Sequence, residues 1–192
     1  MIKEIKYNEK IIDCNIDKGF ALDIELSSWN KLYRLDFIKN NHLLFPLDNY
    51  FEDYIFTMDV VKNSNRIAYI SDSLYCYIVE REGNLSNNQL QKAEDIIEAS
   101  KRIAESYKKE GLFDRFYEEL KAVAILNIND KLRQVIRQNN KDIKNQYIEN
   151  AFNFIKTYYH DYKSKYHIYN NISDRICTSK FLLKIYMFIK GY

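Results

Sequence analysis

Two adjacent carboxylates, Glu52 and Asp53, open an apolar stretch that predicts a buried helix from residue 52 to about residue 61. Neighbouring helical positions point about 100° apart, so the two groups face different surroundings. A helix N-terminus lowers a carboxylate pKa, whereas burial and a second carboxylate raise it. A carboxylate balanced between these effects can take a proton from a hydroxyl, which is worth roughly 10²–10⁴ in rate. The alternative is that both acids only offset the helix dipole.

A second cluster, residues 27–34, holds the only tryptophan of the chain, Trp29, followed by Asn30 and Lys31. A tryptophan offers a flat apolar face with one N–H donor, which suits a sugar ring. An asparagine side chain both donates to and accepts from hydroxyls, and a lysine offsets phosphate charge or pairs with an acid. The alternative interpretation makes Trp29 a core residue and Lys31 a surface cation.

Short elements are expected to position these clusters. Partial alternation of apolar and polar residues predicts strands over residues 11–16 and 20–26, with a turn between them. Residues 28–41 suit a short helix. Beyond the helix that begins at Glu52, residues 66–70 and 74–79 again read as strands. Together these patterns predict a small α/β unit over residues 1–88.

The pattern changes after residue 88, where apolar residues recur at helical spacing. The predicted helices span about residues 90–111, 112–136, 143–162 and 179–189, and residues 166–171 are predicted as a loop. With 4 Gly and 1 Pro in 192 residues, the composition also favours long helices. We therefore predict a helix-dominated α+β fold whose helical part, residues 89–192, packs on the first.

Charge divides the chain in the same way. Residues 1–88 carry 10 Lys and Arg against 14 Asp and Glu, whereas residues 89–192 carry 19 against 13. The three cysteines are far apart and lie in no metal-ligand spacing, which predicts buried free thiols and no metal site. The sequence starts with no signal peptide, and no apolar run approaches the ~20 residues that span a bilayer. We expect a cytoplasmic protein that does not bind nucleic acid.

The order of the pieces resembles the latter half of the catalytic domain of family 2 glycosyltransferases, over roughly residues 20–88. The resemblance is carried by residues 29–34, Pro46, the Glu52-Asp53 pair, residues 74–77 and Arg81 with Leu85-Ser86. It implies a GT-A fold, a Rossmann-like mixed sheet of which this chain would hold a part. It also implies transfer of a sugar from a nucleotide-sugar to a hydroxyl acceptor, with inversion, in the synthesis of surface polysaccharide or glycolipid.

The resemblance also implies roles for individual residues. Asp53 would be the catalytic base, with Glu52 beside it in the acceptor site or supporting the loop. The acceptor side would be lined by Trp29, Asn30 and Lys31. The far end of the pocket would be shaped by Tyr75, Tyr77 and Arg81, although the tyrosines suit strand packing equally well.

The sequence departs from the family upstream of Trp29. Family members carry an N-terminal half that binds the nucleotide, and an Asp-x-Asp motif that holds Mg²⁺ or Mn²⁺. Here Asp23 and Glu25 give only a loose echo of that motif. We expect no metal or other cofactor on this chain, and no activity without a nucleotide-binding half.

A different interpretation is a non-catalytic helical module that binds a protein partner or a membrane surface. It predicts no cleft at Asp53, a fully packed Trp29 and a Glu52 that points to solvent. The glycosyltransferase interpretation predicts that Trp29, Asn30 and Asp53 converge on one open concave surface. The cationic, apolar segment 179–189 suits peripheral membrane contact. An incomplete sheet would also favour self-association.

Overall fold

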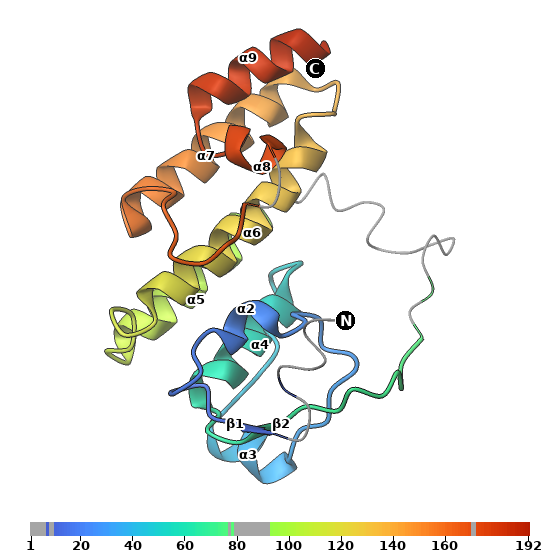
Figure 1. The fold of residues 1–192 in the computed structure, drawn as a ribbon, viewed down its shortest axis with the longest axis vertical. Coiled ribbons are helices and arrows are strands. Elements are labelled where there is room, and N and C mark those ends of the chain that lie inside the picture. The colour runs from blue at the N-terminus through green and yellow to red at the C-terminus, as the bar shows by residue number, and fades with distance from the viewer. Residues whose placement is uncertain (1–6, 8–9, 77, 79–92, 170–171) are drawn as a thin grey trace. The chain divides into compact units, whose positions relative to one another are not determined.

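The computed structural model describes residues 7, 10–76, 78, 93–169 and 172–192 (Figure 1). The chain divides into two compact units, Met1–Asn84 and Leu85–Tyr192. Each unit is described by itself below. Helices dominate the described residues, which also form a small two-stranded sheet, in agreement with the expected α+β class.

The sheet of the first unit joins segments far apart in the sequence. Strand β1, Ile11–Ile12, pairs antiparallel with strand β2, Ile67–Ala68. In this register Ile11 lies opposite Ala68, and Ile12 lies opposite Ile67. Strands were predicted at both places, but each is shorter than the alternating pattern indicated.

The prediction of a strand over residues 20–26 is wrong, because Phe20–Asp23 form helix α2. The physical reason lies in the contact with Tyr7. The Tyr7 ring meets the Phe20 ring edge-on at 5.1 Å between centroids, and the Tyr7 hydroxyl donates to Asp23 Oδ2 at 2.6 Å. Residues three apart lie on one face of a helix, so a helical turn lets Phe20 and Asp23 meet Tyr7 together.

The helix predicted for residues 28–41 is also shorter, since helix α3 covers only Leu35–Asn40. Asn30 has a left-handed backbone with φ of 61°, which a right-handed helix cannot contain. The strand predicted for residues 74–79 is not formed in its described part, because residues 74–76 and 78 have no regular structure.

Helix α4, Glu52–Asn63, is the central element of the first unit and confirms the predicted helix. It buries residues on several faces, from Tyr54 to Lys62. Phe56 and Val60 form a cluster with Leu43, against which Tyr33, Phe37 and Ile38 pack. The α4 N-terminus, where the two acids lie, is thereby fixed against the 27–34 segment.

The second unit is built on three long helices, α5 (Asp95–Lys109), α6 (Tyr117–Val135) and α7 (Lys141–Tyr159), which contact one another in every pairing. Two shorter helices follow, α8 (Ile172–Ile176) and α9 (Lys180–Lys190), and these two contact each other (Figure 1). The four predicted helices are confirmed with small shifts of their bounds. Helix α8 was not predicted.

Buried tyrosines hold the long helices together. Tyr107, Tyr147 and Tyr159 are fully buried. The Tyr147 hydroxyl on α7 donates to the Ile128 carbonyl oxygen on α6 at 2.9 Å, and the Tyr117 hydroxyl donates to the Tyr159 carbonyl oxygen at 2.7 Å. These bonds satisfy polar groups that would otherwise be costly to bury.

The structure also tests the predictions about the cysteines and about membrane-spanning segments. Cys14 and Cys177 are buried free thiols, as expected, but Cys76 is exposed because segment 74–76 is not part of a sheet. Of the helices that the structure describes, none is both long and apolar enough to cross a membrane.

Candidate functional site

Glu52 and Asp53 occupy the first turn of helix α4, and both side chains are half-buried. The Asp53 Oδ1 atom accepts a hydrogen bond from the Tyr54 backbone N–H at 2.9 Å. A backbone N–H of the first helical turn therefore holds one oxygen of the Asp53 carboxylate. The turn before the helix is closed by Asn49, whose Oδ1 accepts from the Phe51 N–H at 2.8 Å.

The pKa of Asp53 lies above the usual value for an aspartate. Burial contributes most to this rise, and the neighbouring Glu52 adds to it. The backbone N–H groups of Tyr54 and Asp53 and the charge of Lys31 act in the opposite direction but do not cancel it. A carboxylate with a raised pKa binds a proton more strongly than an ordinary aspartate does.

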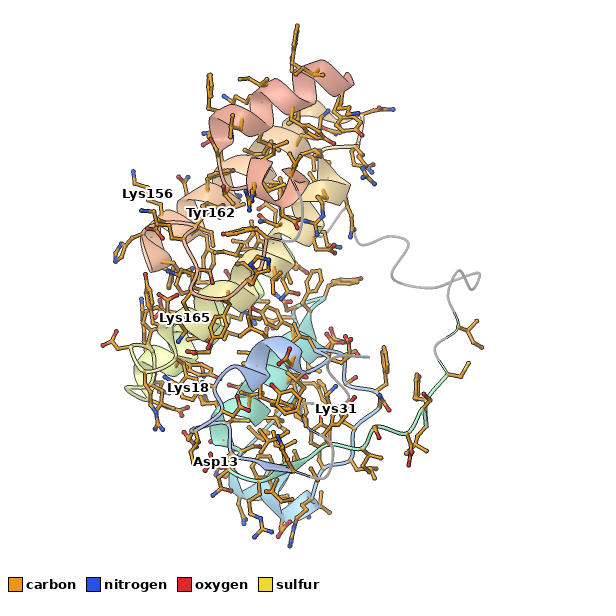
Figure 2. All side chains as sticks on the ribbon, viewed as in Figure 1. Asp13, Lys18, Lys31, Lys156, Tyr162 and Lys165 are labelled. Carbon is orange, nitrogen blue, oxygen red and sulfur yellow. The ribbon has the colours of Figure 1, made fainter. Side chains whose placement is uncertain are left out.

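Lys31 lies close enough to Asp53 for each charge to affect the other's pKa. The side chain of Lys31 is labelled in Figure 2. Its ammonium group donates to the Ser27 carbonyl oxygen at 2.6 Å, which holds the side chain against its own segment. Burial lowers the pKa of Lys31, and the charges of Glu25 and Asp53 offset this only in part. Lys31 is thus a half-buried cation on the Asp53 side of the unit.

Tyr33 belongs to the same group of side chains, although we did not predict it as a site residue. Its hydroxyl is buried, with no hydrogen-bond partner among the described residues. Burial and the Asp53 charge raise the pKa of the hydroxyl. The ring meets Phe56 edge-on at 5.5 Å between centroids, and Phe56 lies one turn after Asp53. The sequence offered no signal for it, because residues 28–41 suited a helix, in which positions two apart lie on different faces.

Trp29 and Tyr75 form a second group. Their rings are stacked, with centroids 4.8 Å apart and planes inclined by 13°. Trp29 is half-buried and Tyr75 is half exposed, so the pair offers apolar surface at the border of the unit. Asn30, between Trp29 and Lys31, is exposed and has a left-handed backbone.

Two of the predicted residues, Tyr77 and Arg81, lie outside the described residues, as do Leu85 and Ser86. The structure therefore groups Lys31, Tyr33 and Asp53 with Glu52, and separately pairs Trp29 with Tyr75. Trp29 and Glu52 are both half-buried, which distinguishes neither interpretation from the other.

The residues around Asp53 do not fit a divalent cation. Mg²⁺ and Mn²⁺ require several oxygen ligands. The positive charge that acts on the Asp53 carboxylate is already supplied by Lys31. In the parts of the chain that the structure describes, no three His, Cys, Asp or Glu side chains are grouped to hold a metal ion.

A hollow of about 380 Å³ lies in the second unit. Its lining includes Phe113, Tyr158 and His160. The ammonium group of Lys108 stands 4.3 Å from the centre of the Tyr158 ring and 4.9 Å from that of Phe113. The aromatic faces of this hollow are thus already covered by a cation of the chain itself.

Comparison with known proteins gives one relationship. The chain is similar to the poly(ribitol-phosphate) beta-N-acetylglucosaminyltransferase TarS of Staphylococcus aureus, in strains MW2 and Mu50, with 37% identity over 75 residues. The matched part is 38% of this chain and 13% of TarS. No family model matches the sequence. No solved structure matches it. Over part of its length, the chain is related to a glycosyltransferase.

Proposed function

We propose that the first unit carries the acceptor and base side of an inverting glycosyltransferase with a GT-A-like catalytic domain. Such an enzyme moves a sugar from a nucleotide-sugar to a hydroxyl of a surface polysaccharide or glycolipid. The observation that carries the proposal is the half-buried Asp53, whose raised pKa makes it a base at the start of α4. The partial similarity to TarS supports the same class of reaction.

In the proposed reaction, Asp53 accepts the proton of the acceptor hydroxyl as that oxygen attacks the anomeric carbon. The bond from the anomeric carbon to the phosphate oxygen breaks on the opposite face, and the nucleoside diphosphate leaves with the bonding electrons. The charge of Lys31 favours the ionised form of this carboxylate, against burial and Glu52, which raise its pKa. The stacked Trp29 and Tyr75 rings provide an apolar face for a sugar ring.

The donor is bound by a nucleotide-binding half, which the reaction needs in addition to the residues placed here. That half also holds any Mg²⁺ or Mn²⁺, since the residues around Asp53 do not fit one. The name of the relative suggests the first substrates to test: nucleotide-activated N-acetylglucosamine as donor and poly(ribitol-phosphate) as acceptor.

The test is turnover of the chain supplied with a family 2 nucleotide-binding half, measured as release of nucleoside diphosphate. Asp53→Asn is expected to lower kcat by roughly 10²–10⁴ with little change in KM. Asp72→Asn, which changes an exposed carboxylate of the same unit, serves as the matched control. Turnover of Asp53→Asn at the level of the unaltered chain would remove the assignment of the base.

The second candidate function, a helical module that binds a partner surface, is favoured by a separate observation. Helix α9 buries only Leu183 and exposes most of its other apolar side chains. The two functions are compatible, because this helix lies in the unit that does not contain Asp53.

A further inference from the structure

Helix α9 presents an apolar face that its own unit leaves uncovered. Leu183 is 0% exposed and is the buried anchor of the helix, while Phe188 is 88% exposed. At 100° per residue, the exposed large apolar residues fall within an arc of roughly 120° on the side opposite Leu183. These residues, the α9 face, are Phe181, Leu182, Ile185, Phe188 and Ile189.

The charges of α9 are all of one sign. The helix contains Lys180, Lys184 and Lys190 and no acidic residue. Lys180 pairs with Glu149 on α7, Lys184 is exposed at one edge of the α9 face, and Lys190 is exposed in the last turn of the helix. Residues 160–192 together carry 6 Lys and Arg against 2 Asp and Glu. The helix that carries the apolar face is therefore cationic.

We propose that the α9 face docks on an anionic lipid bilayer, with the helix lying in the plane of the interface. An 11-residue helix is about 16 Å long, too short to cross a hydrocarbon core of ~30 Å but suited to lie in its boundary. Aromatic and aliphatic side chains enter the acyl region there, while flanking lysines reach the headgroups.

A second copy of the chain fits the α9 face less well. Pairing two copies of one patch across a two-fold axis brings like charges together, and α9 supplies no acidic partner for Lys184 or Lys190. Glu149 on α7 already acts on Lys184, and an anionic headgroup layer adds opposite charge for both lysines. Charge complementarity thus selects the bilayer among the possible occupants.

The experiment is co-sedimentation with phosphatidylglycerol/phosphatidylcholine vesicles and with phosphatidylcholine vesicles alone. The unaltered chain should bind the anionic vesicles at least tenfold more tightly than the neutral ones, and binding should weaken as salt is raised. Phe188→Ser/Ile189→Ser should lower binding to anionic vesicles at least tenfold. The matched control, Leu44→Ser/Leu47→Ser, removes two exposed apolar side chains of the first unit and should bind as before.

Two further variants separate the contributions. Lys184→Glu/Lys190→Glu should abolish the preference for anionic vesicles, whereas Lys39→Glu, an exposed lysine on α3, should keep it. Phe188→Trp should show blue-shifted emission that brominated lipids quench, after subtraction of the Trp29 signal.

Equal binding to both vesicle types, or unchanged binding by Phe188→Ser/Ile189→Ser, would overturn the proposal. The proposal would also fail if the unaltered chain bound no vesicles and instead formed a dimer that Phe188→Ser/Ile189→Ser dissociates. No activity is measured, so the outcome is independent of the glycosyltransferase proposal.

Discussion

The two units of the chain reach stability by different routes. The second unit buries its apolar side chains between three long helices, with Ala99, Tyr147 and Ile155 fully enclosed. The first unit joins short elements by long irregular segments and leaves Leu32 and Leu47 fully exposed. Its enclosed part is centred on the single helix α4.

The candidate catalytic side chains lie in the less regular of the two units. The half-buried charged groups Lys31 and Asp53 lie in the first unit, where irregular backbone brings side chains from distant segments together. Lys31 lies in such an irregular segment, as functional side chains often do, whereas Asp53 lies in the first turn of α4. The second unit contributes the continuous α9 face instead.

The largest expected effect comes from cavities in the two cores. Leu132→Ala on α6 should lower the free energy of unfolding by about 2–5 kcal/mol, and Phe56→Ala on α4 by about 3–5 kcal/mol. In urea titrations, circular dichroism reports mainly the long helices, and Trp29 fluorescence reports the first unit. We expect Leu132→Ala to shift the first signal and Phe56→Ala the second.

The exposed Leu47→Ala is the control for both variants and should change stability by less than about 0.5 kcal/mol. If each cavity moved both signals equally, the two units would unfold together and the contrast drawn above would fail.

A smaller effect is expected for the bond that ties α4 to the segment before Trp29. The Thr57 hydroxyl donates to the Leu26 carbonyl oxygen at 2.9 Å. Thr57→Val keeps the shape of the side chain but removes the donor, which should cost about 1 kcal/mol in the fluorescence transition. Thr57→Ser retains the hydroxyl and should keep the Trp29 emission maximum. A shift of that maximum in Thr57→Ser but not in Thr57→Val would contradict this role.

A comparable effect is expected at the start of α7. The Asn140 Oδ1 atom accepts from the N–H groups of Asp142 and Ile143 at 3.0 and 3.1 Å. Asn140→Ala should lower stability by about 1 kcal/mol, seen by circular dichroism, and Asn140→Asp should restore most of it. The neighbouring Asn139→Ala gives the control, and an equal loss in it would exclude capping as the cause.

The smallest and most discriminating test uses two carboxylates whose pKa values shift in opposite directions. Burial raises the pKa of Glu119, but hydrogen bonds from Tyr166 and Lys165 outweigh it, and the pKa lies below the usual value. Glu119 therefore stabilises the folded second unit above its ordinary pKa of ~4.3, and this contribution is lost as pH falls through the lowered value. Glu119→Gln should remove this pH-dependent loss of stability, seen in urea midpoints followed by circular dichroism.

Asp53 contributes to the pH dependence of stability with the opposite sign, because its pKa is raised in the folded chain. Its ionisation costs stability, so its penalty on the first unit disappears as pH falls through the raised pKa toward the ordinary value of ~3.9. Urea midpoints from pH 7 to pH 4 should thus rise for the unaltered chain relative to Asp53→Asn, by fluorescence. The same sign for both carboxylates would show that their surroundings do not differ as described.

Local patterns predicted the helices well but the strands poorly. The helical repeat of α5, α6 and α7 is contained in consecutive residues, so it can be seen without knowing the partners. The strand interpretation of residues 20–26 failed because Tyr7, far upstream, selects a helical turn there. Helix α8 has 5 residues, too few to show a repeat.

For the site, the residue types at Trp29, Lys31 and Asp53 were sufficient to select candidates. Their grouping was not predictable, because the Trp29–Tyr75 stack and the pair of Lys31 and Asp53 each join segments separated by many residues. Tyr33 was missed for the same reason, since only the packing of its ring on Phe56 places its hydroxyl near Asp53.

The sequence by itself determined where the long helices run and which residues could act on a hydroxyl, because both depend on residue types at short spacing. The tertiary structure alone decided the direction of the Asp53 pKa shift, the pairing of β1 with β2, and the outward orientation of the α9 face. Burial and long-range contact set all three. A repeat of apolar residues predicts that a helix has a face, but only packing determines whether that face is covered.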